Sequence, residues 1–85
     1  MRSPVLDLIR LLAEIERQPG IHRSEMAETL GVSMSTVTRL LRQARERYQL
    51  RITRDAGPKG VYVIESWGLL DRERVMIAAG TGKDQ

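Results

Sequence analysis

Residues 23–42, RSEMAETLGVSMSTVTRLLR, decide the fold of this chain, because they place a tight turn between two helical segments. A short helix is expected over 23–30, and Gly31 is well suited to end it because glycine adopts a positive φ without strain. Ser33 can then cap a longer helix, expected over 34–48, by accepting a hydrogen bond from a backbone N–H of its first turn. The stretch therefore predicts two helices that cross at close range.

Small and apolar side chains inside the same stretch hold the two helices together. Ala27 is the small residue where the helices meet, and Gly31 follows four positions later. The apolar residues expected to lock the pair are Met26, Leu30, Val32, Val37 and Leu40. All seven residues fall in the register of one twenty-residue helix–turn–helix unit, and this agreement is more specific than any single match.

The flanking sequence adds a helix before this unit and a hairpin after it. Ser3 and Pro4 suit an N-cap and a first helical position, and an apolar stripe follows at helical spacing. The stripe consists of Val5, Leu8, Ile9, Leu12 and Ile15, widened by Leu6 and Leu11. After the long helix the apolar period falls from 3.6 to 2, which predicts a β-hairpin over 51–64 with its turn at 55–60.

Beyond the hairpin the chain is expected to return to the core. The apolar run at 67–70 should pack against it, followed by a short helix over about 72–79. Residues 80–85 are expected to form a frayed tail. The predicted organisation is one domain over 1–66, a packing or dimerisation segment over 67–79 and the tail. The predicted fold class is mainly α-helical with a small antiparallel β-hairpin.

Positive charge is confined to the middle of the chain. The 85 residues carry 14 basic and 11 acidic side chains, a net charge of +3. Residues 35–60 alone hold seven basic residues against two acidic ones, so the rest of the chain is slightly negative. A local positive field favours a polyanion such as nucleic acid, and a solvated helix face is the alternative interpretation. The outward position of several arginines on the predicted 34–48 helix favours nucleic acid.

These features together resemble one family. The chain is similar to the winged helix–turn–helix domains of bacterial transcriptional regulators, above all those of the deoxyribose-operon-repressor and biotin-operon-repressor kinds. The residues that carry the resemblance are Leu11-Leu12, Ile21, Met26-Ala27, Leu30-Gly31-Val32-Ser33, Ser35-Thr36-Val37, Leu40-Leu41 and the hairpin Ile52 … Gly60-Val61-Tyr62-Val63-Ile64. The resemblance spans roughly residues 5–64. It implies a three-helix core, a small sheet to which Ile21 adds a short strand, a DNA-reading helix and a hairpin wing.

The resemblance also implies which side chains read DNA, since such a helix enters the major groove by its N-terminal half. The residues expected at base edges are Met34, Ser35, Thr38, Arg39 and Arg42. Arg39 is the strongest candidate, because arginine pairs with guanine O6 and N7 through two parallel hydrogen bonds. Met34 either contacts a thymine methyl group or packs internally.

A second set of residues is expected at the DNA backbone or in the wing. This set is Ser33, Thr36, Arg51, Arg54 and Lys59. A serine near a helix N-terminus can bond phosphate, but a plain N-cap is the simpler interpretation for Ser33. For the wing residues the alternative is a charge solvated at a turn. Arg45 and Arg47, late in the helix, are expected to be surface charges or partners of nearby acidic residues.

The composition argues against most other classes of function. Without cysteine, and with His22 as the single histidine, neither a disulfide framework nor a metal site is expected, and no cofactor is implied. No catalytic triad is visible, and residues 80–83, GTGK, lack the first glycine and the following Ser or Thr of a phosphate loop. We therefore expect no enzyme activity, no membrane span and a cytoplasmic location.

The leading hypothesis is a sequence-specific double-stranded DNA-binding protein that acts as a small transcriptional regulator. A homodimer is expected, on half-sites about 34 Å apart. The predicted dimer contacts are Leu69, Leu70, Val75, Met76 and Ile77, because 67–79 is more apolar than an exposed tail needs. The first helix is the other candidate for the dimer surface. The alternative is a winged-helix protein-interaction module whose arginine face meets an acidic protein. Sequence-independent DNA binding is a third hypothesis, and no small-molecule effector is evident.

Overall fold

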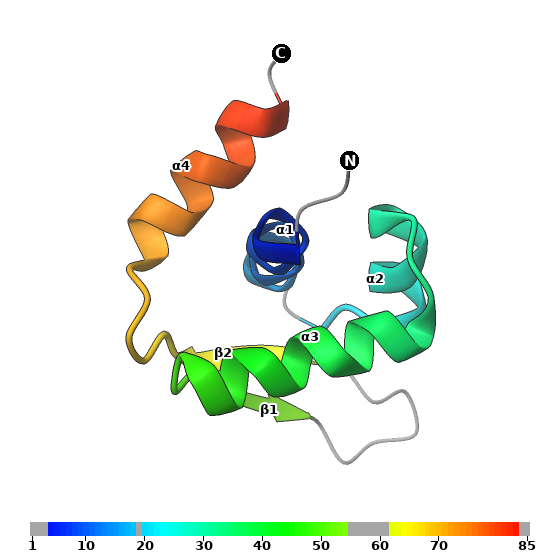
Figure 1. Cartoon of the computed structure of the whole chain (residues 1–85), viewed down its shortest axis with the longest axis horizontal. Coiled ribbons are helices and arrows are strands. Elements are labelled where there is room, and N and C mark those ends of the chain that lie inside the picture. The colour runs from blue at the N-terminus through cyan, green and yellow to red at the C-terminus, as the bar shows by residue number, and fades with distance from the viewer. Residues whose placement is uncertain (1–3, 19, 55–61, 84–85) are drawn as a thin grey trace.

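Helices and a small sheet pack around one central helix in this chain. The computed structural model describes residues 4–18, 20–54 and 62–83. The elements, in chain order, are α1 (Pro4–Arg17), α2 (Arg23–Leu30), α3 (Met34–Arg47), β1 (Arg51–Arg54), β2 (Tyr62–Ser66) and α4 (Arg72–Lys83). The described chain is therefore mainly helical with a two-stranded antiparallel sheet, as the sequence predicts. Figure 1 shows α1 in the middle, seen nearly end-on, with α2, α3 and α4 around it.

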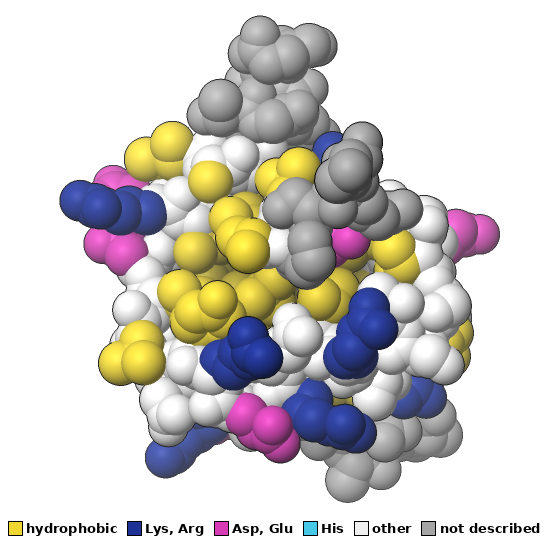
Figure 2. Space-filling model, viewed as in Figure 1, with side chains coloured by type: hydrophobic (Ala, Val, Ile, Leu, Met, Phe, Trp, Pro, Cys, Tyr) yellow, Lys and Arg dark blue, Asp and Glu magenta, His cyan; other side chains and the backbone are white. Residues whose placement is uncertain are grey.

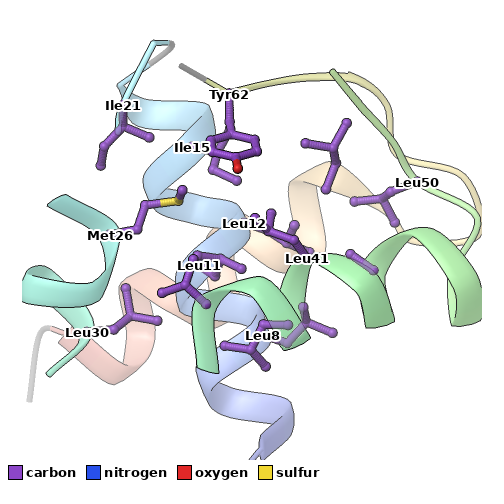
Figure 3. Close-up of a cluster of buried hydrophobic side chains, with 14 of the residues drawn as sticks. Leu8, Leu11, Leu12, Ile15, Ile21, Met26, Leu30, Leu41, Leu50 and Tyr62 are labelled. Carbon is purple, nitrogen blue, oxygen red and sulfur yellow. The ribbon is translucent and has the colours of Figure 1, made fainter. Parts of the chain in front are cut away.

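The core forms around α1 because this helix is apolar over much of its surface. Leu11 and Leu12 have no exposed surface. Figure 3 shows them between Met26 and Leu30 of α2 on one side and Leu41 of α3 on the other. Burying an aliphatic side chain of this size stabilises the fold by about 1.5–3 kcal/mol. The central helix is thus the element that the other helices share.

The first turn of α1 differs from the prediction. Val5, expected on the buried stripe, is 59% exposed, and Leu6 is also exposed. Burial begins at Asp7 and Leu8. Apolar periodicity shows which side of a helix faces inward, but it does not show how far the neighbouring elements extend along that helix.

The connection between α2 and α3 has the local geometry that the sequence predicts. Gly31 adopts φ 71° and ψ 35°, and its N–H donates to the Glu28 carbonyl at 3.2 Å. The N–H of Val32 donates to the Ala27 carbonyl at 3.0 Å, so two carbonyls at the end of α2 are satisfied. Ser33 is the N-cap of α3, as expected, which fixes the start of the longer helix.

The sheet pairs β1 with β2 in antiparallel register, with Ile52 opposite Ile64 and an irregularity after Arg51. The expected third strand is present as a single bridge between Ile21 and Tyr62. The N–H of Tyr62 donates to the Ile21 carbonyl at 3.3 Å. This bridge ties the link between α1 and α2 to the sheet, and Tyr62 lies buried below it.

A close backbone contact connects the end of α3 to the segment that leads into α4. Gln49 and Gly68 both have a positive φ, 60° and 57°. The N–H of Leu69 donates to the Tyr48 carbonyl at 2.8 Å, and a Cβ on Gly68 would lie 2.3 Å from the Gln49 carbonyl oxygen. Only glycine fits at position 68, because any side chain would overlap that backbone.

The last helix is longer than the sequence predicts. α4 begins as expected after Asp71, whose Oδ1 accepts the N–H of Arg74 at 3.1 Å. It continues to Lys83, so the prediction that 80–83 belong to a frayed tail is wrong. Gly80 lies inside the helix, where glycine costs only about 1 kcal/mol relative to alanine. A single glycine is therefore too weak a signal to mark the end of a helix.

Two contacts hold α4 across α1. Val75 and Ala79 are buried, and Val75 belongs to the same hydrophobic cluster as the residues of α1. Arg72 Nε lies 2.5 Å from Glu16 Oε2, which joins the first turn of α4 to the C-terminal half of α1. None of the helices described here is long and apolar enough to cross a membrane.

Candidate nucleic-acid interface

α3 buries one side and exposes a basic side. Its buried residues are Val37, Leu40, Leu41 and Ala44. Arg39 and Arg42 lie on the other side and are exposed, as are Met34 and Ser35. Figure 2 shows basic side chains gathered over α3, below a group of hydrophobic ones. Because the core fixes the buried stripe, the arginines are held outward on a rigid element.

Thr38 lies at the edge of this surface and is half-buried. Its Oγ1 donates to the Met34 carbonyl at 3.1 Å and accepts a hydrogen bond from Arg23 Nη1 at 3.2 Å. Arg23 is the first residue of α2 and was absent from the predicted site. Its place at the start of the helix–turn–helix unit was visible in the sequence, but only the crossing of α2 and α3 brings it beside Thr38.

The two hydroxyl residues at the start of α3 bond to each other. Ser33 Oγ accepts the N–H of Thr36 at 3.1 Å and lies 3.0 Å from Thr36 Oγ1. Ser33 therefore acts as an N-cap, the simpler of the two interpretations made from the sequence. A capping oxygen satisfies a helix N–H that otherwise has no partner within the helix. Ser35, by contrast, is exposed on the outer side of the same turn.

The arginine at position 45 has a role that sequence reasoning missed. Arg45 is exposed, as one of its two interpretations predicts, and its Nη2 donates to the carbonyl of Ile52 at 3.0 Å, so it ties α3 to β1. Arg51, on the same strand, is exposed, as a contact with the DNA phosphate backbone would require. The side chain of Arg54 and the whole of Lys59 lie outside the described residues. Of the predicted wing set, the structure therefore locates Arg51.

An open groove of about 620 Å³ runs beside the N-terminal half of α3. Its lining comprises Asp7, Gly31, Val32, Ser33, Thr36, Arg39, Leu40 and Gln43. Asp7, from α1, is only 6% exposed and brings one acidic group to the border of a basic surface. Asp7 was not among the predicted site residues and lies 26 positions before the first of them, Ser33, so only the fold brings them together.

The predicted dimer residues are divided between the core and the surface. Val75 is buried in the core of its own chain and Leu70 packs against that core, so neither presents a full side chain to a partner. Met76 is half-buried. Leu69 is 73% exposed, and Ile77, another apolar residue of the predicted dimerisation segment, is 61% exposed. The exposed apolar surface of this segment is therefore carried by two of the predicted residues, Leu69 and Ile77.

Titratable groups do not gather into a metal-binding cluster within the described residues. No group of three or more His, Cys, Asp or Glu side chains there is close enough to hold a metal ion. His22 caps α2, and its N–H donates to Glu25 Oε1 at 3.0 Å. Comparisons with protein-family models, curated proteins and solved structures give no match for this chain.

Proposed function

We propose that this chain is a winged helix–turn–helix protein that binds double-stranded DNA in a sequence-specific manner and acts as a small transcriptional regulator. The observation that supports the proposal most is the exposed basic side of α3, opposite a fully buried stripe. The glycine turn and the close contact with α2 hold this helix at the surface of the core. Such a helix can enter the major groove without disturbing the core that carries it.

In the proposed complex the N-terminal half of α3 lies in the major groove. Arg39 and Arg42 reach base edges, and Met34, Ser35 and Thr38 contact the same groove. An arginine bonded to guanine O6 and N7 contributes about 1–3 kcal/mol of discrimination between bases. Arg51 and the hairpin contact the phosphate backbone, where charge supplies affinity but little sequence information.

The proposed regulator binds as a homodimer on a two-fold-related site. One reading helix contacts few base pairs, and two copies one helical turn apart double the contacts. Leu69 and Ile77 are the exposed apolar residues near α4 that such an interface would cover. Light scattering on the protein with and without DNA tests this step, and a monomer in both conditions would contradict it.

The test of DNA binding is a fluorescence anisotropy titration with labelled duplexes from the region upstream of the gene and from a random pool. Wild type is compared with the double variant Arg39→Ala/Arg42→Ala. The matched control is Arg10→Ala/Arg74→Ala, which removes the same charge from exposed positions on α1 and α4. We expect wild type and control to resist random competitor DNA, and the α3 variant to lose that resistance.

Two results would contradict the proposal. Equal weakening by both double variants would mean that charge alone drives binding, which is the sequence-independent alternative. No binding of any duplex at low salt would mean that the arginine side of α3 meets an acidic protein surface instead. In that case the same two double variants can be compared for binding to the protein partner.

A further inference from the structure

We infer that Arg23 fixes the hydrogen-bonding polarity of Thr38, and that Thr38 thereby selects an A·T base pair. The inference rests on the proposed function, because it requires α3 to lie in the major groove. It adds to that function a positioning residue outside the predicted site and the identity of one base pair in the target. The starting point is the pair of hydrogen bonds that Thr38 makes within the protein.

The hydroxyl group of Thr38 already donates its one O–H within the protein, so it cannot donate to a base. A threonine hydroxyl offers one O–H donor and two acceptor lone pairs. Thr38 Oγ1 donates to the Met34 carbonyl at 3.1 Å, the carbonyl four residues earlier in the same helix. One lone pair accepts from Arg23 Nη1 at 3.2 Å. What remains for a ligand is one acceptor lone pair and the γ-methyl group.

Arg23 keeps the hydroxyl in this orientation. A guanidinium carries donors and no acceptor, so its approach turns the O–H of Thr38 away from α2 and toward Met34. Arg23 Nε is buried without a hydrogen-bond partner among the described residues. Leaving such a donor unpaired lowers stability, so this atom does not stabilise the fold. Its burial also restricts the side chain to a position beside α3.

The chemistry of the major groove then favours one kind of base pair. An A·T pair presents the adenine N6 amino donor and the thymine methyl group, and these complement an acceptor and a methyl group. A G·C pair presents two guanine acceptors, one cytosine donor and no methyl group. Thr38 therefore matches both distinctive groups of A·T and only one group of G·C.

The test begins with duplexes selected by the wild-type protein from a random pool. The base pair read by position 38 is the one whose preference changes in Thr38→Ala. At that pair adenine is replaced by purine, which lacks the amino group, and thymine by uracil, which lacks the methyl group. We expect each replacement to weaken wild-type binding by about three- to tenfold, the range of one modest contact.

The protein variants separate the two residues. Thr38→Val keeps a methyl group and loses the acceptor. Its affinity should therefore still fall when thymine is replaced by uracil, but no longer when adenine is replaced by purine. Arg23→Met should lose the preference for A·T over G·C while its thermal stability is unchanged or raised, because an unpaired buried donor is removed. Arg23→Lys retains a donor and should recover part of the preference. Arg74→Met removes the same charge from α4 and should leave the preference intact.

The possible results separate a failure of this inference from a failure of the proposed DNA-binding function. If wild type selects a defined duplex but position 38 prefers G·C, the inference is wrong and the proposed function stands. The same holds if Arg23→Met keeps the full A·T preference. If no duplex competes better than random DNA, the proposed function fails and the inference fails with it.

Discussion

α3 and α4 are helices of similar length, 14 and 12 residues, on the edge of the same core, yet they are held there in different ways. α3 buries a continuous stripe of apolar residues and exposes a polar side. α4 buries Val75 and Ala79 and leaves Ile77 exposed between them. The position of α3 thus follows from its own periodicity, whereas α4 depends also on contacts made in and just before its first turn.

The difference has a physical cause. A periodic stripe can face the core in one orientation only, because turning the helix would expose apolar surface and bury arginines. A helix whose apolar residues do not form a clear stripe can face the core in more than one orientation. For α4 the backbone contact at Gly68 and the Arg72–Glu16 ion pair of its first turn add to the burial of Val75 and Ala79 in setting the orientation. Substitutions at Gly68, Val75, Arg51 and Arg72 test this difference.

The contact at Gly68 should produce the largest effect on stability. In Gly68→Ala the new Cβ meets the backbone of Tyr48 and Gln49 at 2.3–2.4 Å, at a φ of 57°. The left-handed conformation costs about 1–2 kcal/mol and the crowding about 1–3 kcal/mol, so urea denaturation should show a loss of about 2–5 kcal/mol. Gly80→Ala is the matched control, since nothing lies within 4 Å of its Cβ. That control should gain up to about 1 kcal/mol, and equal effects at both glycines would contradict the close approach.

Which side of α4 faces α1 is tested by substitutions at positions 75 and 77. Val75→Ala should lower the free energy of unfolding by about 2 kcal/mol, because Val75 is buried in the core. Ile77→Ala should change it by less than about 0.5 kcal/mol, because Ile77 is 61% exposed. Thermal or urea unfolding of both variants checks the assignment. A larger loss for Ile77→Ala than for Val75→Ala would show that the opposite side of α4 faces α1.

Arg51 of β1, the strand next to α3, should contribute to DNA affinity by a smaller amount than the effects above. Arg51 is exposed on β1, and we expect Arg51→Ala to reduce the log–log slope of affinity against salt by about one unit. Because a phosphate contact carries no base information, the ranking of duplex sequences should stay the same. Anisotropy titrations over a salt series measure both quantities. An unchanged slope would remove Arg51 from the interface.

The ion pair that joins α4 to α1 should have the smallest effect. The Arg72 side chain is more than half exposed, so solvent screens its attraction to Glu16. Arg72→Ala should lower stability by no more than about 0.5–1 kcal/mol, and less at high salt. Urea denaturation at two salt concentrations checks this. A loss as large as that of Val75→Ala would mean that charge, and not apolar burial, holds α4 in place.

Much of the candidate site could be predicted because it lies within one short unit of sequence. Ser33, Arg39 and Arg42 belong to a single capped helix, so spacing alone places the cap at its start and the arginines on its outer side. Arg23 and Arg45 could not be assigned in this way. Each bonds to a residue of another element, Thr38 and Ile52, and such partners depend on how the elements cross.

Local sequence patterns were enough to predict α2, its glycine turn, α3 and the two strands, because caps, a positive-φ glycine and periodicity act over a few neighbouring residues. The tertiary structure alone decided the length and register of α4, the exposure of Val5 and the close approach at Gly68. These features depend on which surfaces remain uncovered after the core has formed. Which surfaces stay uncovered depends on contacts between residues far apart in the chain, and a local sequence pattern cannot predict such contacts.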